Sequence, residues 1–129
     1  MNQNIICWFE IYVEDLDRAK SFYSAVLGTS FTDAEQAPGD APGDMRMSFF
    51  SSPENQGVSG ALIEIPGAKP GGGLNTMVYF PCVDCAVETA RVEAAGGQVK
   101  DPKMNLGEFG FCAICIDTEG NFFGLYSME

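Results

Sequence analysis

The sequence predicts an α+β fold of two βαβββ modules, each a curved mixed or antiparallel sheet with its helix on the convex face. Each half of the chain shows the same order of elements: a strand, a helix and then three strands. A shift of 69 residues places Asp15 on Asp84 and Gly28 on Gly97, so both halves have the same helix-capping residues at the same separation. The length, 129 residues, is that of one ordinary domain.

The two modules are expected at about residues 5–65 and 74–129, within a single domain covering residues 1–129. The linker between them, residues 66–73, reads PGAKPGGG and is rich in residues that break regular structure. The three consecutive glycines at residues 71–73 are not followed by the Lys-Ser/Thr pair of a phosphate-binding loop, so they indicate a flexible connection.

The first module begins with a strand and a capped helix. Residues 7–13 alternate in the manner of a strand, Asp15 suits a helix N-cap and Gly28 suits the position just past the helix. Apolar residues at helical spacing lie between these caps: Leu16, Ala19, Phe22, Tyr23, Val26 and Leu27. Three strands should follow, at residues 29–32, 45–50 (after the turn-rich stretch 37–43) and 60–65.

The second module repeats this plan. Residues 75–80 form the expected strand, Asp84 caps a helix with a stripe of Val87, Ala90 and Ala94, and Gly96-Gly97 ends it. A short strand should begin at Val99, and two more should cover residues 111–116 and 122–126, joined by a turn at residues 117–121.

The two faces of the first strand are expected to differ, because a helix covers only one face of a sheet. Phe9, Ile11 and Val13 should pack under the helix, whereas Trp8, Glu10 and Tyr12 should face the concave side. The partner module or a ligand must cover that side, so it is the expected functional pocket.

The amino-acid composition disfavours several classes of binding partner. Seven basic and 18 acidic residues give a net charge of −11, which disfavours nucleic acid and anionic membranes. The N-terminus does not resemble a signal peptide and no apolar run has transmembrane length, so a cytoplasmic location is expected. The chain has no histidine, which removes the commonest general base and the commonest nitrogen ligand for metals.

Three segments resemble the vicinal-oxygen-chelate (glyoxalase/bleomycin-resistance/dioxygenase) superfamily, and in particular its glyoxalase-like branch. FEIYVEDLDRAKSFYSAVLG (9–28) resembles the first strand and helix, GALIEI (60–65) the fourth strand, and DTEGNFFGL (117–125) the last turn and strand. The resemblance covers essentially the whole chain and implies the predicted fold, a small-molecule ligand and a homodimer. It does not identify one activity, because the superfamily hosts many chemistries.

Metal-binding members of this superfamily take ligands from the first and last strands of each module. By this resemblance the four ligand positions fall at Trp8, Glu64, Met77 and Gly124. Only Glu64 is a carboxylate, since tryptophan donates only an N–H group, a thioether prefers soft metals and glycine has no side chain. We therefore expect no metal or other cofactor.

Two glutamates are the candidate catalytic residues. Glu10 shares a face with Trp8, and Glu64 lies on a strand expected to border the same pocket, where burial would raise a carboxyl pKa and suit it to proton transfer. The alternative is that either glutamate only accepts structural hydrogen bonds. The remaining pocket candidates are Trp8, Tyr12, Met77, Tyr79, Phe111, Cys115, Phe122 and Tyr126. These side chains either line a cavity or fill it completely.

The five cysteines include two CxxC pairs, at residues 82–85 and 112–115, which together resemble a zinc pattern. Cys112 and Cys115 are three residues apart on an expected strand and should point to opposite faces, so they cannot share an ion. Cys82 and Cys85 flank a helix start, where a redox role competes with simple burial.

The leading hypothesis is a glyoxalase/bleomycin-resistance-like protein that binds a small molecule, or transfers a proton, in a concave aromatic pocket without a metal. One alternative is a metal-dependent lyase or isomerase resembling lactoylglutathione lyase, which would use Glu64 and Glu10 with thiol ligands. Another is a structural or interaction protein whose pocket is collapsed.

Overall fold

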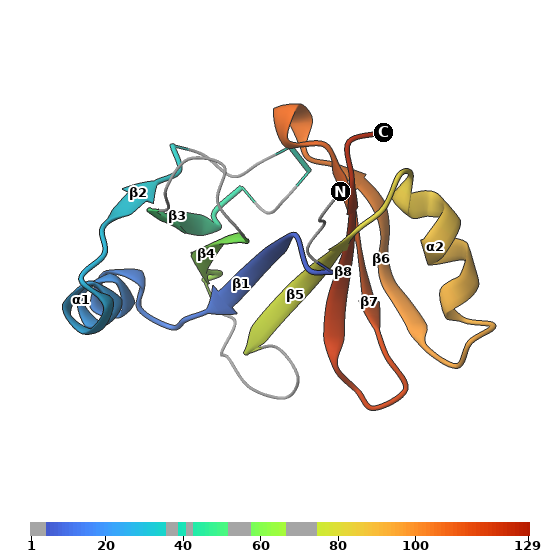
Figure 1. Ribbon diagram of the computed structural model, residues 1–129, viewed down its shortest axis with the longest axis horizontal. Coiled ribbons are helices and arrows are strands. Elements are labelled where there is room, and N and C mark those ends of the chain that lie inside the picture. The colour runs from blue at the N-terminus through green and yellow to red at the C-terminus, as the bar shows by residue number, and fades with distance from the viewer. Residues whose placement is uncertain (1–4, 36–38, 41–42, 52–57, 67–74) are drawn as a thin grey trace.

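A computed structural model describes residues 5–35, 39–40, 43–51, 58–66 and 75–129. The predicted linker therefore lies outside the described residues except for Pro66, as does most of the turn-rich stretch 37–43. The elements are β1 (Trp8–Tyr12), α1 (Leu16–Leu27), β2 (Phe31–Asp33), β3 (Arg46–Phe50), β4 (Ser59–Glu64), β5 (Thr76–Pro81), α2 (Cys85–Val92), β6 (Gln98–Asn105), a 3₁₀ turn (Gly107–Phe109), β7 (Phe111–Ile116) and β8 (Phe122–Ser127) (Figure 1).

The strands form one mixed sheet in the order β2-β3-β4-β1-β5-β8-β7-β6. Within each half, the first and last strands are parallel, β1 with β4 and β5 with β8, and the remaining pairs are antiparallel. The halves join where β1 pairs antiparallel with β5. The predicted α+β fold is confirmed, with the two βαβββ units fused edge to edge.

Both predicted helix N-caps are confirmed. The Asp15 side chain accepts the Arg18 N–H at 3.0 Å, and the Asp84 side chain accepts the Ala86 N–H at 3.0 Å. Gly28 ends α1 in the left-handed conformation, with φ of 65°. The second module differs slightly, because α2 ends at Val92 and Gly96, rather than Gly97, adopts a positive φ of 106°.

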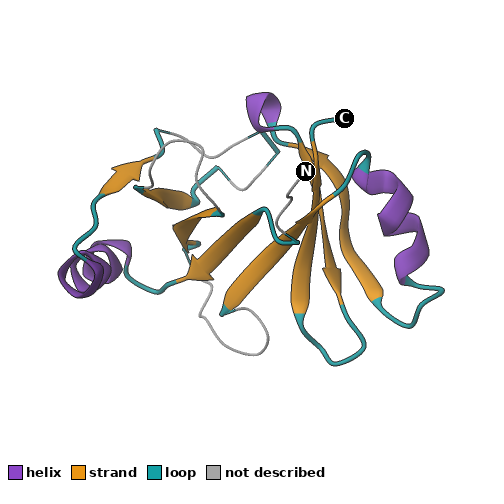
Figure 2. Cartoon of the chain, viewed as in Figure 1, coloured by secondary structure: helices purple, strands orange, loops and turns teal. Residues whose placement is uncertain are grey.

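The two helices cover the outer face of the sheet at its two ends (Figures 1 and 2). Helix α2 packs closely on β6, β7 and β8 around Cys85, Cys115 and Leu125. Helix α1 lies against β3 and β4, but only Leu16 of its predicted apolar stripe is buried.

Three residues of the α1 stripe face solvent. Phe22, Val26 and Leu27 are 59%, 62% and 60% exposed. These residues therefore do not pack on the sheet. Their helical spacing correctly predicted the helix, but spacing does not specify how much sheet lies beneath it.

The sixth strand is longer than predicted, because β6 runs through Lys100, Asp101 and Pro102 to Asn105. Those residues do not alternate, and proline is unfavourable inside a sheet. Strand β6 lies at the sheet edge and its register shifts twice against β7, which accommodates the proline. In the described part of the chain, no helix has the length and apolar character needed to cross a bilayer.

Candidate functional site

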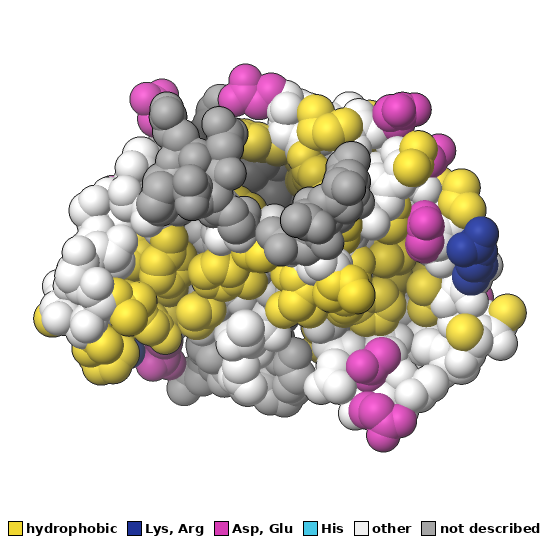
Figure 3. Space-filling view, viewed as in Figure 1, with side chains coloured by type: hydrophobic (Ala, Val, Ile, Leu, Met, Phe, Trp, Pro, Cys, Tyr) yellow, Lys and Arg dark blue, Asp and Glu magenta, His cyan; other side chains and the backbone are white. Residues whose placement is uncertain are grey.

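The concave face of the sheet encloses a cavity of about 990 Å³, large enough for a drug-sized ligand. Trp8, Glu10 and Tyr12 enter it from β1, and Met77 and Tyr79 enter from β5. Further walls come from β3 and β4 (Met47, Phe49, Ile63), β7 and β8 (Cys112, Ile114, Phe122, Tyr126) and the segment after β6 (Leu106, Phe109). The space-filling view shows the broad apolar band across this side of the molecule, with acidic side chains around its edges (Figure 3).

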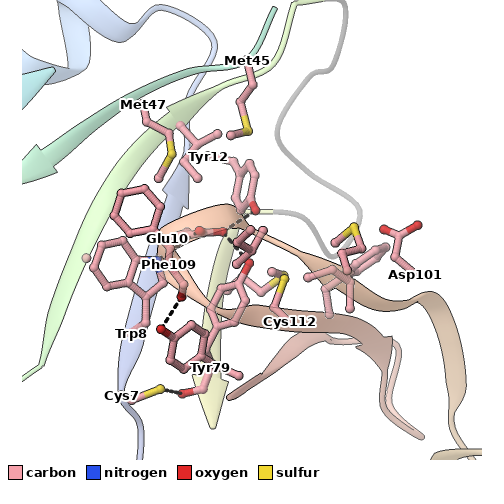
Figure 4. A pocket seen from close by; sticks show the side chains of 18 of the residues that line it. Cys7, Trp8, Glu10, Tyr12, Met45, Met47, Tyr79, Asp101, Phe109 and Cys112 are labelled. Carbon is pink, nitrogen blue, oxygen red and sulfur yellow. Dashed lines mark hydrogen bonds between the residues drawn. The ribbon is translucent and has the colours of Figure 1, made fainter. Parts of the chain in front are cut away.

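Glu10 is the polar centre of the cavity, although it is only 7% exposed. Its Oε1 accepts the hydroxyl groups of Tyr12 at 2.6 Å and Tyr79 at 2.9 Å, and its Oε2 accepts the Trp8 indole N–H at 3.0 Å. The close-up shows these side chains converging from both halves of the sheet (Figure 4). A buried carboxylate with three donors is held in one orientation.

Burial raises the pKa of Glu10 above its usual range, and the hydrogen bonds from Tyr12, Tyr79 and Trp8 oppose this rise. Burial and the neighbouring Glu10 carboxylate also raise the phenol pKa values of Tyr12 and Tyr79, which therefore remain hydrogen-bond donors at neutral pH. The site thus combines a carboxyl group whose proton affinity is raised with two phenols that remain protonated.

The structure brings together most of the pocket residues predicted from sequence. Trp8, Glu10, Tyr12, Met77, Tyr79, Phe122 and Tyr126 all line the cavity. Their roles toward a ligand stay predictions.

Three predicted site residues lie elsewhere. Phe111 and Cys115 are on the outer face: Lys103 Nζ lies 4.6 Å from the Phe111 ring centroid, and Cys115 packs under α2. Their neighbours Cys112 and Ile114 enter the cavity instead. Both faces of β7 are apolar, so hydrophobic alternation could not decide which set faced inward.

Glu64 also points away from the cavity, because Ile63 and Ile65 occupy the inward positions around it. Its Oε1 accepts the Leu16 N–H at the start of α1 at 3.2 Å and lies 3.2 Å from Arg46 Nη1. Glu64 thus anchors α1 to the sheet. The expectation that Glu64 borders the same pocket as Glu10 is wrong.

Glu64→Ala is expected to lower the free energy of unfolding by about 1 kcal/mol, since it removes one hydrogen bond to α1 and a partly exposed ion pair. Urea unfolding measures this change. Glu64→Gln, which keeps an acceptor for Leu16 N–H, should lose less. Equal stability of the wild type and the alanine variant would contradict the anchoring role.

Several residues that line the cavity could not be identified from sequence. Met45 lies just before β3 and Met47 lies within it. Met104 is in β6, Leu106 follows that strand, and Phe109 is in the 3₁₀ turn. A hydrogen bond from the Tyr126 hydroxyl to the Phe109 carbonyl holds that turn over the cavity. Only the alternation of β3 carried a usable signal, because irregular segments have no periodicity to interpret.

The residues at the superfamily's ligand positions do not fit a divalent metal. The Trp8 indole N–H is directed at Glu10, Met77 is 1% exposed and Glu64 is on the other face. A Cβ at Gly124 would lie 2.1 Å from the Tyr79 ring, so this ring occupies the space of a side chain there. Across the described residues, no group of three or more His, Cys, Asp or Glu side chains is placed to hold an ion.

The cysteines are all free among the described residues. As predicted, Cys112 and Cys115 point to opposite faces of the sheet, but Cys112 is the one that faces the cavity and Cys115 lies on the outer face. Burial and the nearby Glu88 raise the pKa of Cys82 to about 11, and Cys85 is fully buried. The helix start therefore does not stabilise a Cys82 thiolate.

Comparisons with known proteins agree with this geometry. Residues 6–35 match the family described as bleomycin resistance protein-like N-terminal. Two mycobacterial proteins, both named "Putative glyoxylase CFP32", from Mycobacterium bovis and Mycobacterium tuberculosis, are 28% identical over 120 residues. That match covers 93% of this chain but 42% of each relative, so the chain spans less than half of their length.

Solved structures share the fold. Methylmalonyl-CoA epimerase from Mycobacterium tuberculosis superposes with a TM-score of 0.68 at 14% identity, covering 100% of this chain and 93% of that one. Hypothetical protein BH1468 from Bacillus halodurans gives 0.68 at 13% identity, with 96% and 94% covered. At such identities the likeness shows the fold alone.

The fold and cavity define a protein of paired βαβββ modules around a ligand-sized pocket. Together with the family match over residues 6–35 and the glyoxylase relatives, they indicate the vicinal-oxygen-chelate superfamily and a likeness to its glyoxalase and bleomycin-resistance proteins.

Proposed function

We propose that this chain binds a small organic molecule in the cavity between its two halves, and that the binding needs no metal ion. The observation that carries this proposal is Glu10, a nearly buried carboxylate presented to a ligand-sized cavity by three hydrogen bonds. Burying a carboxylate is unfavourable, so a structure that retains one in an apolar cavity points to a functional role.

The structure disfavours the two alternative functions suggested by the sequence. The collapsed-pocket hypothesis is contradicted by the open cavity, which Trp8 and Met77 line without filling it. The metal-dependent lyase hypothesis needs Glu64 beside Glu10, and Glu64 lies on the other face of the sheet. The name of the glyoxylase relatives belongs to proteins more than twice this length and does not assign their reaction to this chain.

A binding screen tests the proposal directly. Trp8 is the single tryptophan of the chain and lines the cavity, so its fluorescence should report occupancy. Untagged, chelator-treated protein would be titrated with a metabolite and drug-fragment panel, using both Trp8 fluorescence and thermal shift. We expect saturable binding that Glu10→Gln weakens and the matched variant Glu64→Gln preserves. No response from any ligand class would overturn the proposal.

Proton transfer on the bound ligand is a second candidate function, favoured by the raised pKa of Glu10. Glu10 would accept a proton from an acidic C–H group of the ligand and return it to carbon. Ligands from the screen would be incubated with the protein in D₂O and followed by proton NMR. Exchange that disappears in Glu10→Gln and persists in Glu64→Gln would support catalysis, and no exchange would leave binding as the function.

The exposed stripe on α1 supports a second part of the proposal, that the chain forms a homodimer. Phe22, Val26 and Leu27 form an apolar face on one helix, which association would remove from water. Light scattering after size exclusion should give the dimer mass for the wild type and the monomer mass for Val26→Glu. A monomeric wild type would rule the dimer out.

A further inference from the structure

The charges around the cavity are predominantly negative. Among the described residues that line it are three carboxylates, Glu10, Asp40 and Asp101, and one cation, Lys100, whose Nζ lies 3.5 Å from Asp101 Oδ2. Figure 4 shows Asp101 at the edge of this group of side chains, away from Trp8. Since the whole chain also carries a net charge of −11, an anionic ligand would be repelled both on approach and inside.

This charge pattern separates the site from one related structure. A methylmalonyl-CoA epimerase with the same fold has been solved in complex with methylmalonyl-CoA, a polyanion. In the present cavity the described lining offers such a ligand no unpaired cation. The shared fold therefore does not imply that this cavity binds an anionic ligand, as the epimerase does.

The walls around Glu10 are aromatic. The rings of Trp8 and Phe49 meet edge to face, with centroids 6.0 Å apart and planes at 66°, and so form a corner of the cavity. The hydroxyl groups of Tyr12 and Tyr79 both contact the same carboxylate oxygen, Glu10 Oε1. The faces of tryptophan and tyrosine rings attract cations, most strongly where water is excluded.

The hydrogen bonds at Glu10 leave room for a donor from the ligand. A carboxylate accepts about four hydrogen bonds, and Glu10 accepts three. The Tyr12 and Tyr79 hydroxyl groups donate to Glu10, and a phenol oxygen can also accept a hydrogen bond. The site is thus rich in acceptors and negative potential, and its available partners suit a positively charged group.

We infer that the ligand of this cavity is an organic cation, an aromatic or alicyclic amine or quaternary ammonium compound, with its charged group between the Trp8, Tyr12 and Tyr79 rings near Glu10. This inference rests on the proposed function and narrows its ligand class. The apolar remainder of the molecule would lie along the methionines and phenylalanines of the cavity, whose flexible thioethers adapt to different shapes.

The test uses three probes built on the same naphthylmethyl group. They are a naphthylmethyl trimethylammonium ion, its uncharged carbon isostere with a tert-butyl group, and naphthylacetate. Calorimetric titration of the untagged full chain at fixed ionic strength gives the three affinities. We expect the cation to bind at least about tenfold more tightly than the isostere, and the anion to bind most weakly.

Variants assign the preference to the cavity. Glu10→Gln should reduce the preference of the cation over the isostere to about threefold or less, and Glu64→Gln should keep it. Asp101→Asn should weaken the cation about two- to threefold with no effect on the isostere. Glu93→Gln, which removes a charge from α2 on the other face, controls for net charge. If Glu10→Gln does not fold, the comparison of Asp101→Asn with its control Glu93→Gln still tests the inference.

The outcomes separate the inference from the function on which it rests. An isostere that binds as tightly as the cation, or a preference that survives both Glu10→Gln and Asp101→Asn, would overturn the cationic ligand and leave small-molecule binding intact. If none of the three probes binds while a neutral or anionic panel compound does, the cationic ligand is likewise wrong. If no compound of any class binds, both proposals fail.

Discussion

Glu10→Gln is expected to weaken ligand binding about 30- to 100-fold, which corresponds to the two to three kcal/mol that a charged hydrogen bond contributes. Glutamine has the same shape and can still accept from Tyr12 and Tyr79, but it brings no charge and places an NH₂ group against the Trp8 N–H. Titration by fluorescence or calorimetry measures the loss. Affinity within about threefold of wild type would contradict a role for this carboxylate.

The same substitution should remove a pH dependence from the stability of the fold. The folded-state pKa of Glu10 lies above the unfolded value of about 4.5, so between these values the folded chain holds a proton that the unfolded chain has lost. Wild-type stability therefore falls as pH rises through this window, and the glutamine variant lacks this fall.

The groups facing Glu10 do not contribute to this slope. The pKa values of Tyr12, Tyr79 and Cys112 are raised, to about 12 for Cys112, so all three stay protonated. Urea unfolding of both proteins between about pH 4.5 and pH 8 should show the variant gaining stability relative to wild type. A difference that is independent of pH would show that Glu10 titrates normally.

Gly124→Ala is expected to destabilise the fold by about 2–4 kcal/mol, through overpacking and a lost hydrogen bond. The added Cβ would lie 2.1 Å and 2.3 Å from two carbons of the Tyr79 ring. That ring cannot retreat easily, because Tyr79 pairs directly with Gly124 across β5 and β8 and its hydroxyl is bound to Glu10. Moving it would also disorder the site.

Chemical denaturation measures the Gly124→Ala effect, and Gly43→Ala serves as the control because no heavy atom lies within 4 Å of its added Cβ. In a double-mutant cycle, the cost of Gly124→Ala should shrink in a Tyr79→Ala background, where the overlap is absent. A full cost in that background would show that the strain does not come from the ring.

The sequence predicted the cavity best where its alternation was chemically mixed. On β1, apolar residues alternate with Trp8, Glu10 and Tyr12, so the inward face was recognisable. On β4 and β7 both faces carry apolar residues, so the sequence does not determine the inward face, and the prediction that Glu64, Phe111 and Cys115 face the cavity is wrong. The extent of β6 was missed because an edge strand tolerates Pro102, and the exposure of α1 was missed because sequence spacing does not report what covers a helix.

The most important feature of the site could be predicted only in part. Glu10 was identifiable as a concave carboxylate, but its three partners come together only when β1 pairs with β5, since Tyr79 lies 69 residues away in sequence. The ring of Tyr79 beside Gly124 likewise depends on the pairing of β5 with β8. Such contacts depend on register between distant strands, which local patterns do not determine.

If the cavity binds its organic ligand without a metal, the purified chain should contain no bound ion, and the metal content per chain measures this. Inductively coupled plasma mass spectrometry would be run on untagged, reduced protein purified without chelator, before and after soaking with zinc, nickel, manganese and iron. We expect well below one ion per chain in both wild type and Glu10→Gln. Close to one ion per chain in the wild type, lost in Glu10→Gln, would contradict this expectation.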